Sequence, residues 1–283
     1  LSSSDSSSNG CGNVRAHEFK ARLPAHEGQH ALRPGSDHRE ELCPMLSALV
    51  RKLLRRDDLS EEQKRRLEAL PISSRRVSMG EMINEAGDRP TFSTLLIEGM
   101  AGRMALLSSG ARQFTELVLP GDFVDLHSLV MKRVNQGVLA FTDGLIGLLP
   151  HDALRRLMAD DLHLARLLWL ETVVDGAVHR TWLVGLGRKD ATARMAHLFC
   201  ETHARLDAVE LVKDGRFPFP LSQTELADML GLSPVHVNRT LMGLRGAGLI
   251  EWRDKILEIR DLGRLTRLAE FDPAYLRLWK EPV

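Results

Sequence analysis

The stretch 221-LSQTELADMLGLSPVHVNRTLMGLRGAGLI-250 decides the fold, because its residues predict two short helices and the turn between them. Ser222, with a glutamate three positions later, is a capping box that begins a helix. Gly231 predicts the end of that helix, since glycine adopts a left-handed backbone at little cost. Ser233 then predicts a second N-cap, and Pro234 takes the first helical position, where no N–H is needed.

The two predicted helices share an apolar face across their short turn. The inward residues at helical spacing are Leu226, Leu230, Val237 and Leu241. This spacing is typical of a helix-turn-helix, in which the N-terminal end of the second helix contacts base edges in the major groove. The alternative is a capped helical hairpin that binds nothing.

Residues at the start of both helices and along the second are the predicted DNA contacts. They are Ser222, Gln223, Thr224, Ser233, Val235, His236, Asn238, Arg239, Thr240 and Arg245.

Two short strands are predicted behind the second helix, at 248-GLIEW-252 and 255-KILEI-259, and they form the hairpin of a winged helix. Residues 218–268 carry seven basic and six acidic residues, which is a weak electrostatic signal for DNA binding. The basic residues that cluster in the helix and the hairpin are Arg239, Arg245, Arg253 and Lys255.

Residues 72–150 have the pattern of a β domain. Short apolar runs such as 94-TLLIEG-99 are separated by glycine-bearing turns at roughly 8- to 12-residue spacing, which is typical of an antiparallel sandwich or barrel. Residues 45–70 predict two short helices, the second capped by Ser60. The polar residues 1–42 predict a disordered tail.

A long helix with a hinge is predicted over residues 161–187. Its apolar and small residues repeat at spacings of three and four, the pattern of a coiled-coil seam; these predicted dimerisation residues are Leu167, Leu170, Val174, Ala177 and Thr181. A second copy of the helix is the simplest cover for such a stripe, so we expect a homodimer. The alternative is that the stripe packs on its own β domain. Gly185 and Gly187 predict the hinge.

The composition argues against several other classes of protein. The formal net charge is zero, which disfavours diffuse binding to nucleic acid or membrane, and no apolar run approaches the roughly 18 residues of a membrane span. Three widely spaced cysteines fit a reducing cytoplasm better than a disulfide framework. No catalytic, phosphate-binding or metal-ligand motif is present, so the sequence predicts no enzyme activity, no metal site and no cofactor.

The order of these parts resembles the cyclic-AMP receptor/FNR (Crp/Fnr) family of bacterial transcription regulators over about residues 45–265. The most specific parts are the opening stretch, 99-GMAGRMALLSSGARQFTELVLPGDF-123 and 187-GRKDATARMAHLF-199. The resemblance implies an α+β chain with an N-terminal β-roll of the cyclic-nucleotide-binding jelly-roll type, a long dimerisation helix and a C-terminal winged helix-turn-helix. It also implies that Arg239 reads guanine, which groove chemistry favours as well.

This interpretation divides the chain into four parts. They are a tail at 1–42, a β-roll sensor-like domain with flanking helices at 43–160, the dimerisation helix and hinge at 161–187, and the DNA-binding domain at 188–283. The expected partners are a palindromic double-stranded DNA operator, a second copy of the chain and RNA polymerase, in the cytoplasm and away from membranes.

The chain departs from the cyclic-nucleotide members of that family. They bear Gly-Glu after the Gly-Asp-Phe turn and Arg-Ser or Arg-Thr further on, where this chain has Asp125-Leu126 and Gln136-Gly137. Without that arginine no fixed cation meets the cyclic phosphate, so we expect a signal other than cyclic AMP.

Three further alternatives concern that signal. The oxygen-sensing members hold an iron–sulfur cluster on clustered N-terminal cysteines, whereas Cys11 and Cys43 are each alone in their segments, which disfavours such a cluster. In the second alternative the β-roll binds haem or another small molecule, with His127 as a candidate ligand. In the third the β-roll is empty and the regulator is constitutive.

Overall fold

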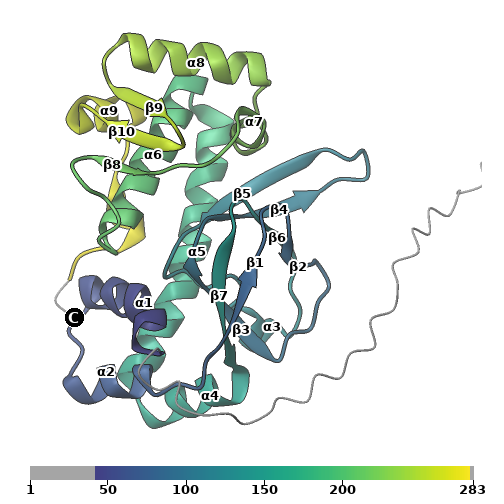
Figure 1. Cartoon of the computed structure of the whole chain (residues 1–283), viewed down its shortest axis with the longest axis vertical. Coiled ribbons are helices and arrows are strands. Elements are labelled where there is room, and N and C mark those ends of the chain that lie inside the picture. Colours follow the sequence, from purple (N-terminus) through teal and green to yellow (C-terminus); the bar gives the residue numbers. More distant parts are fainter. Residues whose placement is uncertain (1–41, 281–283) are drawn as a thin grey trace, which may run out of the picture. The chain divides into compact units, whose positions relative to one another are not determined.

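The structure is a computed structural model that describes residues 42–280, all of which belong to one compact unit (Figure 1). The predicted tail at 1–42 lies outside the described residues, except for Leu42 at its end.

Two helices precede the β domain, as the sequence predicts. They are α1 (Leu42–Arg56) and α2 (Glu61–Glu68). The Ser60 hydroxyl accepts the backbone N–H of Gln63 at 3.2 Å, and the Gln63 side chain accepts the backbone N–H of Ser60 at 3.1 Å. Both halves of the capping box are therefore present.

The predicted β domain consists of two antiparallel sheets. Its strands are β1 (Ser73–Val77), β2 (Met82–Asn84), β3 (Phe92–Glu98), β4 (Ala101–Leu106), β5 (Arg112–Val118), β6 (Gly137–Ala140) and β7 (Gly144–Pro150). The strand orders are β1-β7-β3 and β2-β6-β4-β5, and the short helix α3 (Ser128–Met131) lies between β5 and β6 in sequence. Aliphatic residues from both sheets form one apolar core, which includes Val77, Leu96, Val118, Val138 and Ile146.

Two helices follow, α4 (His151–Asp160) and the long α5 (Leu162–Arg188). Gly185 and Gly187 lie inside α5, which corrects the predicted hinge. The helix ends instead before Lys189, whose backbone is extended. Asp190 then caps the next helix by accepting the backbone N–H of Ala193 at 2.8 Å.

The exposed face of α5 is shifted by one residue from the predicted seam, since Trp169 and Val173 are exposed in place of Leu170 and Val174. Leu167 (3% exposed) packs into an apolar cluster with leucines of α1, α2 and α4, and Val174 (8% exposed) packs with Leu276. These two predicted dimer contacts are therefore covered by their own chain. The large apolar residues that α5 exposes are Leu162, Trp169, Val173, Leu183 and Val184.

The C-terminal part begins with α6 (Ala191–Asp207) and contains the predicted winged helix-turn-helix. Its elements are β8 (Arg216–Pro218), α7 (Gln223–Leu230), α8 (Pro234–Gly246), β9 (Ile250–Arg253), β10 (Ile256–Ile259), α9 (Leu262–Ala269) and the 3-10 turn η1 (Pro273–Leu276). The sheet order is β8-β10-β9, so a third strand, which the sequence analysis missed, joins the predicted hairpin. No helix in residues 42–280 is long and apolar enough to cross a membrane.

Candidate nucleic-acid interface

The caps of the two central helices form as the sequence predicts. The Ser222 hydroxyl accepts the backbone N–H of Glu225 at 3.1 Å, and the Glu225 carboxylate accepts that of Ser222 at 2.6 Å. Gly231 ends α7 with a φ of +61°, in the left-handed region. Ser233 caps α8 by accepting the N–H of His236 at 3.3 Å. Both serines are therefore used in fixing the helix starts.

The apolar faces of α7 and α8 pack against each other and onto α6. All four predicted inward residues are buried, namely Leu226, Leu230, Val237 and Leu241. They share one core with aromatic residues of α6 and β8, including Phe199 and Phe217. This packing fixes which side of α8 faces outward.

The outward side of α8 is open along its N-terminal half. Val235 is 81% exposed, and Asn238 and Arg239 are exposed beside it. A shallow depression is lined by Gln223, Pro234, Val235, Asn238, Arg239 and Met242. The Asn238 amide donates to Gln223 Oε1 at 3.4 Å, which joins the first residue of α7 to this surface. We call this set of six residues the α8 face.

Arg239 is the free cation of the α8 face. Within the described residues its guanidinium has neither a hydrogen bond nor an ion pair, whereas Arg253 in the hairpin pairs with Glu251 at 2.8 Å. An unpaired guanidinium on an exposed helix keeps all its donors for a ligand, and paired acceptors such as guanine O6 and N7 fit its geometry.

Thr240 and Arg245, two of the predicted DNA contacts, lie outside the α8 face. Thr240 is buried, and its hydroxyl donates to the carbonyl oxygen of His236 at 2.9 Å, so it points away from the α8 face. Arg245 is exposed at the other end of α8, where its guanidinium donates to the carbonyl oxygen of Trp252. It supports the hairpin and lies apart from the base-reading end.

The hairpin turn lies at Asp254 and Lys255, which both have positive φ angles (51° and 63°). Two consecutive left-handed residues are typical of a type I′ turn, which matches the twist of the flanking strands. The strand β8 adds to the other edge of β10 and ends at Pro218, a residue that edge strands tolerate. The wing therefore presents Arg253 and Lys255 beside α8.

The β domain contacts the helix-turn-helix directly, which the sequence analysis did not predict. Arg112 in β5 pairs with Asp228 in α7, with Nη2 at 2.8 Å and Nε at 3.2 Å from the same oxygen. The neighbouring Gln113 amide donates to the carbonyl oxygen of Met229 at 3.1 Å. These contacts link the β4–β5 hairpin to the helix that positions α8.

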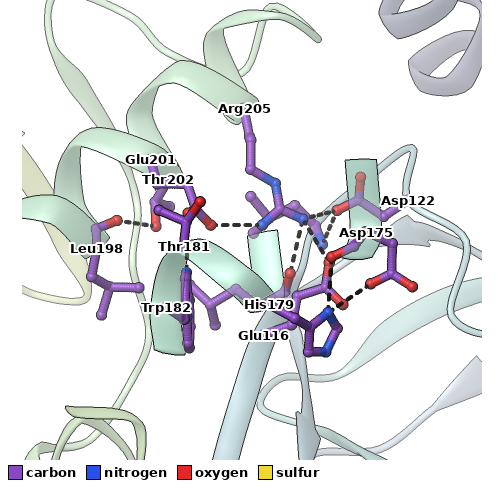
Figure 2. Close-up of polar contacts among 12 residues, drawn as sticks. Glu116, Asp122, Asp175, His179, Thr181, Trp182, Leu198, Glu201, Thr202 and Arg205 are labelled. Atoms are coloured by element: carbon purple, nitrogen blue, oxygen red, sulfur yellow. Dashed lines mark hydrogen bonds and ion pairs between the residues drawn. The ribbon is translucent and has the colours of Figure 1, made fainter. Parts of the chain in front are cut away.

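A buried ionic network connects α6 to the β domain (Figure 2). The Arg205 guanidinium donates to Asp122 at 2.7 Å and to Glu201 at 3.1 Å, and Lys52 donates to Asp122 at 2.9 Å. Burial alone would raise the pKa of Asp122, but the positive charges of Lys52 and Arg205 outweigh it and lower the pKa to about 2. Asp122 is therefore an ionised partner of two cations.

Glu201 fixes the junction between α5 and α6. Its carboxylate accepts the Trp182 indole N–H at 3.0 Å and the Tyr275 hydroxyl at 2.6 Å. These three groups belong to α6, α5 and the C-terminal turn η1 (Figure 2 shows the first two). The predicted hinge region is thus cross-linked by hydrogen bonds.

Asp125 and Gln136, which differ from the residues of the cyclic-nucleotide members, form hydrogen bonds within the β domain. Asp125 is buried and accepts the backbone N–H of Thr94 at 2.6 Å. Gln136 accepts the Thr115 hydroxyl at 3.2 Å. Burial is the main cause that raises the pKa of Asp125, to about 6.

Comparisons with known proteins agree with this geometry. Residues 74–161 match the cyclic nucleotide-binding domain family, and residues 193–268 match the Crp-like helix-turn-helix domain family. The chain is 29% identical to the transcriptional activator protein FnrL of Cereibacter sphaeroides, over 68% of this chain and 79% of that protein. It is 28% identical to the nitrogen fixation regulation protein FixK of Bradyrhizobium diazoefficiens, over 68% of this chain and 80% of that protein.

The solved structure of FixK2 from Bradyrhizobium japonicum is similar over the same parts. Its TM-score is 0.63 at 26% identity, and the match covers 70% of this chain and 98% of that one. The three-part order of β domain, long helix and helix-turn-helix is thus common to both.

Proposed function

Because the chain belongs to the Crp/Fnr family of bacterial transcription regulators, we propose that two copies of it bind one two-fold symmetric DNA site through their α8 helices. The observation that carries the proposal is the open, unpaired Arg239 at the base-reading end of a capped α8. A single recognition helix reads too few base pairs to be specific in a genome, so a dimer is needed. The half-sites then lie about one helical turn apart on one face of the duplex.

The exposed stripe of α5 supports the dimer. From Leu162 the stripe passes through Trp169, Val173 and Gly176 to Leu183, at intervals of seven, four, three and seven positions. Those intervals fit a heptad repeat, which keeps one stripe facing a partner helix along its whole length. Gly176 has no side chain to hold the two helices apart. We therefore propose this stripe as the two-fold contact, one position away from the predicted seam.

We propose that the protein is located in the cytoplasm and that RNA polymerase is one of its partners. A regulator of transcription acts on the chromosome beside the polymerase, which is the reason for both proposals. The β domain then senses a signal other than cyclic AMP, or holds the DNA-binding part in one constant arrangement.

Selection from random duplex DNA tests the proposed function. The full chain should enrich a two-fold symmetric motif with a guanine in each half, since each α8 presents one Arg239. A set of enriched sequences without symmetry, or no enrichment over input DNA, would contradict the proposal.

We expect that the protein does not bind cyclic AMP at micromolar concentration. The place where other members hold the cyclic phosphate has Gln136, which carries no charge and already bonds to Thr115. Buried Asp125 would repel the phosphate when ionised. Calorimetric titration at pH 7.5 should give only the heat of dilution, and a micromolar dissociation constant would overturn the prediction.

A further inference from the structure

Three side chains of the kind that ligate transition metals meet where β5 lies against α5. Glu116 comes from β5, and Asp175 and His179 come from successive turns of α5, so they share one face of that helix (Figure 2). One candidate ligand atom from each of them lies within 4.8 Å of the others. Glu116 is buried, and Asp175 and His179 are half-buried.

Several buried charged side chains surround this cluster. The carboxylates of the network are Glu116, Asp122, Glu171, Asp175 and Glu201, whereas its permanent cations are Lys52, Arg56, Arg103 and Arg205. A further basic side chain in the network is His179, whose Nδ1 lies 3.2 Å from Asp175 Oδ1.

The permanent cations of the network lie unevenly around Glu116 and Asp175. Arg103 Nε lies 3.1 Å from Glu116 Oε2, but its Nη2 is 3.8 Å from Asp175. Arg205 is 3.7 Å from Glu116 Oε1 and has closer partners in Asp122 and Glu201. One oxygen of each carboxylate therefore lacks a close cation.

A second observation points to a ligand here. Asp175 Oδ1 is buried and has no hydrogen-bond partner among the described residues; His179 Nδ1 is 3.2 Å away but bonds to the Asp175 carbonyl oxygen at 2.8 Å. The cavity that Glu116 and Asp175 line, about 40 Å³ in volume, is also lined by His127. The His127 Nε2 atom is buried and has no partner among the described residues either. A buried imidazole nitrogen without a partner is rare, because it forfeits the hydrogen bond that water would give it.

We propose that Glu116, Asp175 and His179 bind one divalent transition-metal ion of the Zn²⁺ type. Imidazole and carboxylate together are the donor set that Zn²⁺ and its neighbours accept, whereas Mg²⁺ and Ca²⁺ prefer oxygen ligands alone. The bound ion would join the β domain to α5. The sequence predicted no metal site, because the ligands come from two segments, β5 and α5, that are distant in sequence and form no known motif.

Cobalt serves as the probe, since Co²⁺ occupies zinc sites and its visible absorption reports nitrogen and oxygen ligands. Full-length protein freed of metal with a chelator and dialysed at pH 7.5 is titrated with Co²⁺ and then with Zn²⁺. One equivalent of Co²⁺ per chain should give an absorption band that Zn²⁺ abolishes. The variants His179→Ala and Asp175→Asn should each bind Co²⁺ roughly tenfold more weakly or worse.

His163→Ala is the matched control, because His163 lies on the same helix but pairs with Asp57 outside the cavity. It should keep the wild-type band. The histidines of residues 1–42 are present in every variant, so the difference between variants reports the cavity alone. Asp175→Asn keeps the shape of the side chain, and near-ultraviolet circular dichroism verifies that each variant is folded. The absence of a saturable band in the wild type, or equal affinity in all four proteins, would overturn the proposal.

Discussion

The double variant Trp169→Glu/Val173→Glu is expected to be monomeric and to lose binding to a two-fold symmetric duplex. The two side chains are 68% and 46% exposed on the chain by itself, so the substitutions leave its own core untouched. In a two-fold interface each residue contacts the same patch of the partner, so four carboxylates would enter one apolar contact. Full burial of an exposed side chain contributes about 1.5–3 kcal/mol, and these four are already partly covered, so the lost burial is below roughly 12 kcal/mol per dimer.

Sedimentation equilibrium at micromolar concentration measures this outcome. Leu107→Glu is the control, since Leu107 is equally apolar and 59% exposed but lies in the turn after β4. It should remain dimeric. A dimeric double variant would show that the stripe of α5 is not the interface. The pair Leu170→Glu/Val174→Glu is a poorer test, because Val174 is buried in its own chain and its substitution would also disturb that packing.

Arg239→Ala is expected to abolish discrimination between the selected site and the same site with its guanines replaced. A bidentate contact to guanine contributes about 1–3 kcal/mol of discrimination, and a symmetric site contains two such contacts. The combined loss of about 2–6 kcal/mol corresponds to roughly 30-fold to 10⁴-fold in affinity. Binding to phosphates persists, so the variant should retain weak, salt-dependent affinity for any duplex.

Fluorescence anisotropy with the two duplexes measures that discrimination. The control is Arg216→Ala, because Arg216 is an exposed arginine in β8 that pairs with Glu258, away from the α8 face. The fold should survive in both variants, since Arg239 has no partner within the described residues and the pair of Arg216 with Glu258 is at the surface. Unchanged discrimination by Arg239→Ala would remove the residue from the readout.

The helix-turn-helix could be predicted because its signals are local. Ser222, Gly231 and Ser233 each fix a helix end through a contact three or four residues away, and the structure has all three. Thr240, one of the predicted DNA contacts, is buried in the structure. Its position three residues after Val237, on the buried side of the helix, could have corrected the prediction.

The parts that could not be predicted depend on contacts distant in sequence. α5 is apolar on two neighbouring faces, so spacing alone cannot tell which face the chain covers itself, and the seam was placed one position off. The pairing of Arg112 with Asp228 joins residues that no motif connects. The cluster of Glu116, Asp175 and His179 is of the same kind, because β5 and α5 meet only in the folded chain.

Methylation interference on the selected duplex tests the central claim most directly. Methylation of guanine N7 removes the major-groove acceptor that Arg239 is proposed to contact. For the wild-type protein, methylation of one guanine in each half-site should block binding, with the two guanines related by the two-fold axis and about one helical turn apart. For Arg239→Ala, the same methylation should have no effect on the remaining binding. Interference that is absent in the wild type, or that persists unchanged in the variant, would contradict major-groove readout by α8.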